Sequence, residues 1–253
     1  MKVCRNWPNG SKRWPRRKSP TPADSPRDSI PSAADPTFTS IISRRRRRDG
    51  SSFPPRRFWR LAMKKIVLDD ILGFIAYEKV RQEFRQEIIE KKKLRRVAVG
   101  DKVSLVFENR DTVIFQIQEM LRAERIGDLD KIREEIAVYN ELIPKPGELS
   151  ATMFLEIEDQ SHLRDDLLKF LGIDEALSLL VGAHSIAGQF EEGRSKEDKI
   201  SAVQYVRFPF SAEAKQEFIR GGRAELAIDL AAYRARVALS AATQASLAED
   251  LAD

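Results

Sequence analysis

Proline divides this 253-residue chain into two parts of different composition. Nine of its twelve prolines fall within residues 1–62, where they exclude a long helix or a central strand. The overall charge of +5 is the sum of +12 over residues 1–62 and −7 over residues 63–253. Residues 1–62 cannot bury enough apolar surface to offset the entropy of ordering them. We therefore expect a disordered basic tail followed by one globular domain over residues 63–253.

Three interpretations of the tail are open. The run Arg44–Arg48, with Arg56, Arg57 and Arg60 nearby, is typical of an arm that binds nucleic acid or an anionic surface. An Arg-rich, Ser-rich and acid-poor start is also typical of an organellar transit peptide. The third interpretation, which we favour, is an over-extended gene start with translation beginning at Met63. Because the acidic domain would repel phosphate, nucleic-acid binding requires a genuine tail.

Several classes of protein are excluded by what the sequence lacks. No stretch reaches the roughly 18 apolar residues of a membrane-spanning helix. The single cysteine, Cys4, cannot form an internal disulfide or a Cys-ligated zinc or iron–sulfur site. Neither a Walker loop nor GxGxxG, the common nucleotide fingerprints, is present. We therefore expect a cytoplasmic protein without a membrane association, whose cofactor, if it has one, is unknown from the sequence.

Hydrophobic periodicity in residues 63–253 predicts both helices and strands. An apolar stripe at Val80, Phe84 and Ile88 predicts a first helix, capped by Asp69 or Asp70 and ending in the basic run 91–96. The elements expected after it are a hairpin over 96–107, helices over 111–126 and 128–142, a strand over 149–157, a helix over 160–171, a hairpin over 177–190, a solvated loop over 191–199, a strand over 201–210, a helix over 211–220, strands over 224–230 and 233–239, and a helix over 241–251. Hairpins beside clustered helices indicate an α+β fold with a mainly antiparallel sheet and helices packed on it.

The strand expected over 149–157 has a regular alternation. Leu149, Ala151 and Met153 fall on one face, and Ser150 and Thr152 fall on the other. This pattern predicts a half-buried strand with its apolar side inward.

Glu124 is the most unusual single residue in the predicted elements. On a helical wheel it falls between Val113 and Ile117, inside the apolar arc of the helix over 111–126. A buried carboxylate must be paired, bound to a metal or protonated, because an isolated buried charge is too costly. One alternative is that the helix has ended by residue 124. Another is that Glu124 pairs with Arg96 or Arg110.

If Glu124 is functional, an enzyme site would bring other groups to it. The candidates for catalytic roles are Glu124, Glu119, Arg122 and Glu148. Glu108, Glu119, Glu124, Glu141 and Glu148 could also supply oxygen ligands to a metal, but no Glu-x-x-His pair supports a di-iron bundle, and we assign no metal ligand. His162 and His184 are expected to be exposed.

The candidates for ligand binding lie at junctions between elements. Arg110 and Asn109 precede a helix whose free N–H groups could hold an anion, although capping by Asn109 or Asp111 explains them equally. The other candidates are Tyr139, Asn140 and Glu141 before the Pro-Lys-Pro-Gly turn, and Gln204 and Arg207 in the strand over 201–210. Turn chemistry accounts for Asn140, and cross-strand pairs to Glu156 or Glu158 would account for the last two.

Three segments carry a family resemblance: FENRDTVIFQIQEMLRAER (107–125), YNELIPKPGELSATMFLEIED (139–159) and ISAVQYVRF (200–208). They resemble the bacterial domain-of-unknown-function family numbered 3501, over about residues 63–253. The resemblance leaves the tail uncovered, which favours a start at Met63. It implies no assigned reaction and no catalytic residue. Genes of this family often lie beside genes for rubrerythrin and iron–sulfur oxidoreductases, which implies a link to redox or peroxide metabolism.

We therefore expect a cytosolic binding or accessory protein for a protein partner or a small anionic ligand. The first alternative is a carboxylate-dependent enzyme, with or without a metal, that has its site around Glu124 and Glu148. The second alternative is nucleic-acid binding through the basic tail. An enzyme would require the candidate side chains to converge in one place.

Overall fold

The computed structural model describes residues 64–157, 167–191, 195–196 and 199–252. The chain divides into two units, residues 1–58 and Trp59–Asp253, and the description below concerns the second. The expected disordered tail lies outside the described residues. Within them, no helix is long and apolar enough to cross a membrane.

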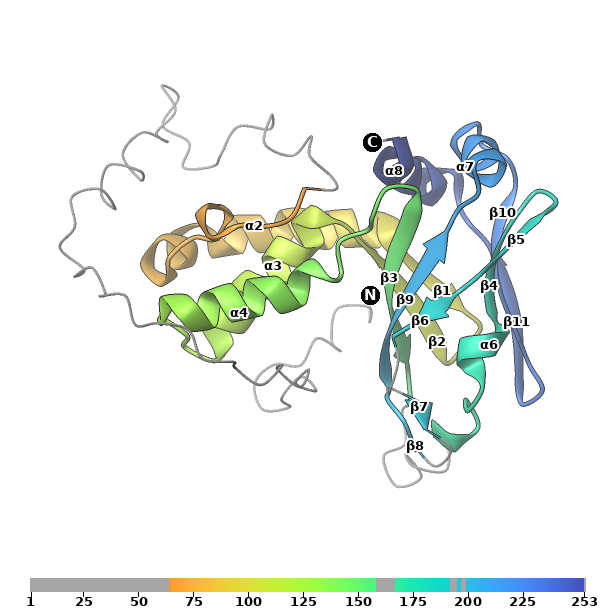
Figure 1. Ribbon diagram of the computed structural model, residues 1–253, viewed down its shortest axis with the longest axis horizontal. Helices are drawn as coiled ribbons and strands as arrows, with labels where there is room; N and C mark the ends of the chain where they lie inside the picture. The colour runs from red at the N-terminus through yellow and green to blue at the C-terminus, as the bar shows by residue number, and fades with distance from the viewer. Residues whose placement is uncertain (1–63, 158–166, 192–194, 197–198, 253) are drawn as a thin grey trace, which may run out of the picture. The chain divides into compact units, whose positions relative to one another are not determined.

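Two antiparallel sheets form one half of this unit (Figure 1). Sheet A contains, in spatial order, β1 (Arg96–Val99), β2 (Val103–Glu108), β3 (Glu148–Leu155), β9 (Val203–Pro209) and β6 (Gln189–Phe190). Sheet B contains β11 (Tyr233–Ala238), β10 (Ala224–Leu230), β4 (Leu177–Val181) and β5 (His184–Ala187). The predicted α+β class is confirmed, with two large sheets in place of one and a further two-stranded pair described below.

The inner faces of the two sheets share one apolar core. Alternate residues of β2 and β3, such as Leu105 and Met153, pack with Leu179 and Leu226 of sheet B. At one side Tyr233 links the sheets, because its hydroxyl donates to the carbonyl of Val99 at 2.7 Å. Helices α7 (Ala212–Ile219) and α8 (Ala241–Ala252) contact each other beside the sheets, and α6 (Ile173–Ala176) precedes β4.

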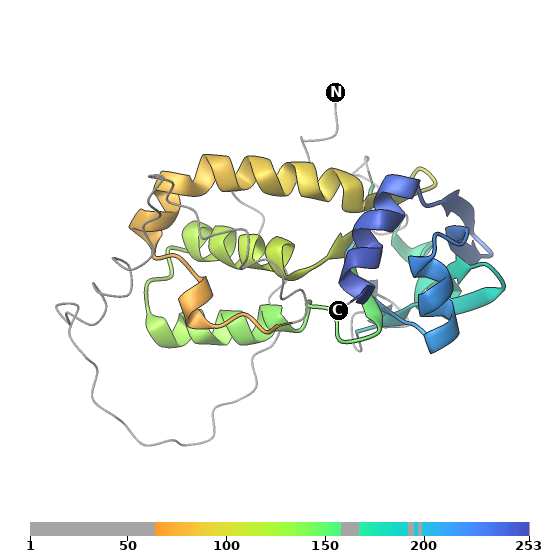
Figure 2. The same ribbon diagram turned by 90° about the horizontal axis from the view of Figure 1, so that it is seen from above.

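Three helices form the other half of the unit. Helices α2 (Phe74–Arg95), α3 (Arg110–Ala123) and α4 (Leu129–Asn140) lie side by side and extend away from the sheets (Figures 1 and 2). Phe84 of α2 makes an edge-to-face contact with Phe115 that joins α2 to α3, and a second one with Tyr77 within α2. The segment before α2 is held by two amides: Asn140 exchanges two hydrogen bonds with Ile66, and Gln118 two with Leu72.

Most predicted elements are confirmed within a few residues, and the differences have local causes. The first helix begins at Phe74 with Gly73 as its N-cap, so the predicted caps Asp69 and Asp70 are wrong. These two residues lie in a separate 3-10 turn, η2 (Leu68–Asp70), where the Asp70 carboxylate accepts from the Val67 N–H. The loop over 191–199 contains two short paired strands, β7 (Ser195–Lys196) and β8 (Lys199–Ile200). The helix expected over 160–171 lies mostly outside the described residues.

Candidate functional site

The outer face of sheet A, which faces away from sheet B, carries buried polar side chains in register. Glu108 lies opposite Ser150 of β3, and Ser150 lies opposite Arg207 of β9. In the next row of the same face Thr152 lies opposite Tyr205. Ser104, Glu108, Ser150 and Thr152, which we call the polar platform, are each between 1% and 3% exposed. Packing alone would favour apolar side chains at such buried positions.

Glu108 is the least satisfied member of the polar platform. Its Oε1 accepts a hydrogen bond from the Thr152 hydroxyl at 2.8 Å, and its Oε2 has no hydrogen-bond partner among the described residues. The residue is 2% exposed, so water does not reach it freely. A buried acceptor left without a donor costs about 1–3 kcal/mol. Gln116, in the second turn of α3, has a second such acceptor, its Oε1.

Lys92 supplies a counter-charge to Glu108. Burial lowers the pKa of the Lys92 ammonium, and the Glu108 carboxylate opposes that shift without cancelling it. A lysine with a lowered pKa beside a buried carboxylate is a recognised sign of a functional site, although structural ion pairs can produce it as well.

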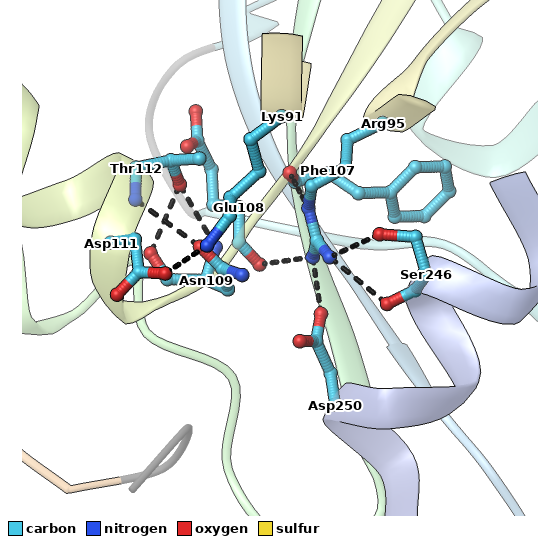
Figure 3. Close-up of polar contacts among 9 residues, drawn as sticks. All are labelled: Lys91, Arg95, Phe107, Glu108, Asn109, Asp111, Thr112, Ser246 and Asp250. Carbon is cyan, nitrogen blue, oxygen red and sulfur yellow. Dashed lines mark hydrogen bonds and ion pairs between the residues drawn. The ribbon is translucent and has the colours of Figure 1, made fainter. Parts of the chain in front are cut away.

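Arg95, the last residue of α2, holds the backbone on both sides of Glu108 (Figure 3). Its guanidinium donates to the carbonyl of Phe107 at 2.9 Å and to that of Glu108 at 3.2 Å. It also donates to the carbonyl of Ser246 in α8 at 3.2 Å and forms an ion pair with Asp250. Burial raises the pKa of the Asp250 carboxyl, and the charge of Arg95 opposes this shift.

The junction between β2 and α3 is closed by local hydrogen bonds. Asn109 caps α3, because its Oδ1 accepts from the Thr112 N–H at 3.2 Å while the Thr112 hydroxyl accepts from the Asn109 N–H at 2.9 Å. Asp111 pairs with Lys91 (Figure 3). Arg110 pairs with Asp70 at 2.6 Å and is buried. The donors that the sequence offered to an anion at this helix start therefore have partners within the chain.

Glu124 does not lie where the helical wheel placed it. Helix α3 ends at Ala123, and Glu124 is its exposed C-cap. The prediction of a buried carboxylate is therefore wrong, and the alternative that the helix has ended by residue 124 is confirmed. Glu124 still has right-handed helical dihedrals, and its N–H donates to the carbonyl of Met120 at 2.9 Å. Its neighbours Ala123 and Arg125 are exposed as well, so the buried face of α3 does not extend to the end of the helix.

The other catalytic candidates have separate partners. Glu119 accepts two hydrogen bonds from Arg81 and one from the Tyr77 hydroxyl, all at 2.7 Å. Burial of Glu119 disfavours its charge, but the hydrogen bonds from Arg81 and Tyr77 outweigh burial and lower the pKa of the carboxyl. Arg122 pairs with Glu78 on α2.

Glu148 pairs with Arg207 in sheet A and does not approach Glu124. Glu148 lies at the sheet end from which α3 starts, whereas Glu124 lies at the far end of that 14-residue helix. At 1.5 Å per residue, such a helix separates its ends by about 21 Å. The four catalytic candidates therefore do not share one site.

The remaining ligand-binding candidates are spread over the molecule. Asn140 binds the backbone of Ile66, and the carbonyl of Glu141 accepts from Arg207. Tyr139 is buried, and burial raises the pKa of its hydroxyl. Gln204 lies opposite Met153 on the inner face of sheet A, away from the polar platform. The expected pairing of Arg207 with Glu156 is wrong, because Arg207 pairs with Glu148 in its place, and Glu158 lies outside the described residues.

No group of three His, Cys, Asp or Glu side chains within the described ranges could hold a metal ion. The five carboxylates considered as oxygen ligands therefore do not form a site there. His184 lies 3.4 Å from Glu217 and is partly exposed, and His162 lies outside the described residues.

The family of proteins of unknown function DUF3501 matches residues 65–251. The chain belongs to this family. The resemblance in the three segments quoted above is thereby confirmed. DUF3501 has no assigned activity in its description, so the family adds no catalytic residue to the geometry.

A protein of unknown function from Burkholderia pseudomallei, known from its crystal structure, has the same fold. It is 31% identical, with a TM-score of 0.71, and the match covers 74% of this chain and 100% of that chain. The DNA polymerase sliding clamp 1 of Pyrobaculum aerophilum is 29% identical over 133 residues. That match covers 51% of each protein, so the chain spans about half the length of this curated relative.

The sequence analysis missed most of the polar platform as a site. Glu108 was considered only as a metal ligand. Thr152 was considered only on the polar face of its strand, Lys92 only within the basic run that ends the first helix, and Ser104 was not considered. The available signal was the alternation of β3, which places Ser150 and Thr152 on one face. That signal predicts a shared face, but it does not reveal that the face is buried.

Proposed function

We propose that this DUF3501 protein is a binding protein for a small polar ligand, which lies on the polar platform and donates a hydrogen bond to Oε2 of Glu108. The observation that carries the proposal is the buried, unpartnered Oε2 of Glu108. An acceptor in that position lowers the stability of the free protein. A ligand that supplies an N–H or O–H donor there would satisfy this acceptor. The free energy that the unsatisfied acceptor costs the free protein would then contribute to the affinity for the ligand.

The chemistry around Glu108 supports a donor-bearing ligand over a simple anion. Lys92 lies near enough for the charge of the Glu108 carboxylate to act on it, so the ligand needs a hydrogen-bond donor and not necessarily a positive charge. The arginines that could attract an anion are paired: Arg96 with Glu156 and Arg207 with Glu148. Tyr205, partly exposed beside Thr152, offers an aromatic surface at the edge of the platform.

An enzymatic role is the second candidate, and Lys92 favours it. Burial lowers the pKa of Lys92, and an ammonium with a lowered pKa gives up its proton to a bound substrate more readily than an ordinary lysine does. This candidate moves the acid–base chemistry from Glu124 and Glu148 to Glu108 and Lys92. The link to redox or peroxide metabolism rests on the family resemblance and is proposed only as the context in which the ligand is used.

The similarity to a sliding clamp suggests a function on DNA, which we do not favour for the domain. Residues 63–253 carry a charge of −7, and a protein that binds duplex DNA usually needs several unpaired Lys or Arg side chains for phosphate contacts. Nucleic-acid binding through the basic residues before Met63 remains a separate proposal.

Two probes that differ in one hydrogen-bond donor test the proposed binding. N-methylacetamide has an N–H donor, and N,N-dimethylacetamide has none. We expect N-methylacetamide to shift the carboxyl carbon resonance of Glu108 in a saturable way, and N,N-dimethylacetamide to leave it unchanged. The variant Glu108→Gln should lose the response, whereas Glu249→Gln, an exposed carboxylate on α8, should keep it. Equal responses to both probes, or no response to either, would contradict the proposal.

A further inference from the structure

We infer that Arg95 and Asp250 are positioning residues for Glu108, so that the C-terminal helix α8 is part of the ligand site although it does not contribute to the polar platform. This inference rests on the proposed function of the platform. It goes beyond that function because it assigns the control of Glu108 to a helix about 140 residues away in sequence.

Arg95 binds both peptide groups that flank the Cα atom of Glu108. The carbonyl of Phe107 belongs to the peptide group before this atom, and the carbonyl of Glu108 belongs to the one after it. One guanidinium binds both, at 2.9 Å and 3.2 Å. Because the two peptide planes at a Cα atom fix the direction of its Cα–Cβ bond, Arg95 fixes the base from which the Glu108 side chain extends, and Thr152 then holds its Oε1.

The same guanidinium is also held by α8, through Nη1 and through Nη2, the nitrogen that binds the Glu108 carbonyl. Ser246 accepts through its carbonyl at 3.2 Å, and Asp250 forms the ion pair (Figure 3). Arg95 is 1% exposed and Asp250 is 4% exposed. A planar guanidinium with donors on several edges can join two such sets of acceptors in a fixed geometry, whereas a lysine ammonium cannot.

If the pair of Arg95 and Asp250 were purely structural, it would hold α8 against the rest of the fold without changing the affinity for the ligand. A positioning pair would change the affinity of the platform even in a variant that stays folded. These two roles are separated by measuring ligand affinity and the position of Glu108 at a temperature far below unfolding.

Arg95→Lys is the main variant, because it keeps the positive charge opposite Asp250 and loses the fork that reaches both carbonyls. Asp250→Asn is the second variant, and it removes the charge from the α8 side. Glu249→Gln is the matched control, since the residue is adjacent on α8 and exposed. The probe is N-methylacetamide, and the two readouts are its dissociation constant and the resonance of the Glu108 carboxyl carbon in the ligand-free protein. Core methyl resonances of Leu226 and Met153 report that each variant is folded.

We expect Arg95→Lys and Asp250→Asn to move the Glu108 resonance in the free protein. We also expect both to raise the dissociation constant of N-methylacetamide on the order of tenfold, which is the scale of loss when groups that orient a binding residue are removed. Glu249→Gln should bind within about twofold of the unaltered protein. If both folded variants bind N-methylacetamide as the unaltered protein does, while Glu108→Gln does not, the positioning role is wrong and the proposed function stands. If the unaltered protein fails to bind, or Glu108→Gln binds equally well, the proposed function and the positioning role are both wrong.

Discussion

The hydroxyl of Thr152 donates to Oε1 of Glu108 at 2.8 Å, across two paired strands of sheet A. This bond fixes one oxygen of the buried carboxylate and leaves the other, Oε2, without a donor among the residues described. The two oxygens of one side chain therefore have different roles in our account. Oε1 stabilises the fold through its bond to Thr152, and Oε2 accepts the hydrogen bond from the ligand.

Removing the Thr152 hydroxyl tests the role of Oε1. Thr152→Val keeps the shape of the side chain but leaves both oxygens of Glu108 unsatisfied. We expect the free energy of unfolding to fall by about 1–3 kcal/mol, the usual cost of an unsatisfied buried polar group. Thr152→Ser keeps a hydroxyl and should lose less. Denaturant unfolding of the two variants measures the difference, and an unchanged stability of Thr152→Val would show that this hydrogen bond does not contribute to the fold.

Glu119 should make the protein sensitive to acid. Its pKa is below the ordinary value of 4.5 because hydrogen bonds from Arg81 and Tyr77 outweigh the effect of burial. An acid whose pKa is lowered by folding stabilises the fold above its ordinary pKa, and this stabilisation is lost as the pH falls through the folded-state value. Glu119→Gln should therefore cost about 1–3 kcal/mol at pH 7. The difference from the unaltered protein should shrink as the pH falls below 4.5.

Glu78→Gln is the control for this prediction, since Glu78 pairs with Arg122 between the same two helices but is much more exposed. An exposed ion pair contributes about 0–1 kcal/mol, so this variant should change the stability little at any pH. Thermal or denaturant unfolding at several pH values compares the two variants. A loss in Glu119→Gln that does not depend on pH would contradict the assigned role of its charge.

Gly100 should not tolerate a side chain. It has φ +75°, and a Cβ atom there would lie 2.2 Å from the Tyr233 hydroxyl oxygen. Gly147 has a similar φ of +79° but nothing within 4 Å of a Cβ atom. Gly147→Ala should cost about 1–2 kcal/mol for the left-handed backbone alone. Gly100→Ala should cost more, because Tyr233 must also move and give up its hydrogen bond to Val99. Equal costs, measured by denaturant unfolding, would indicate that Tyr233 does not constrain this turn.

The sequence predicted local structure well where the apolar residues followed a single strand or helix period. The alternation of Leu149, Ala151 and Met153 predicted β3 and its inward face, and Asp128 was correctly expected to begin α4. The caps of the first helix were wrong, because the carboxylate of Asp70 is used by Val67 and Arg110. The residue preferences at helix starts do not predict that a carboxylate will instead pair with a residue distant in sequence, as Asp70 does with Arg110.

The site was less predictable than the fold for a related reason. Ser150 and Thr152 share a face in any strand, but their burial depends on what packs over sheet A. Glu124 was chosen because a wheel assumes that the helix continues, and α3 ends one residue earlier. The unpartnered oxygen of Glu108 is a property of the packed structure, so no periodicity could have indicated it.

The central claim is that Glu108 is kept for a ligand and not for stability, and Glu108→Gln tests it most directly. Gln retains an oxygen that can accept the Thr152 hydrogen bond while it removes the buried charge. The Lys92 side chain is partly exposed, although its surroundings are crowded enough to lower its pKa, so its ammonium can turn to solvent when the Glu108 charge is lost. We predict that the free energy of unfolding in denaturant stays equal or rises by about 1 kcal/mol, as is common when a functional group is replaced. A loss of about 3–5 kcal/mol, the usual result of breaking a buried structural ion pair, would contradict the account.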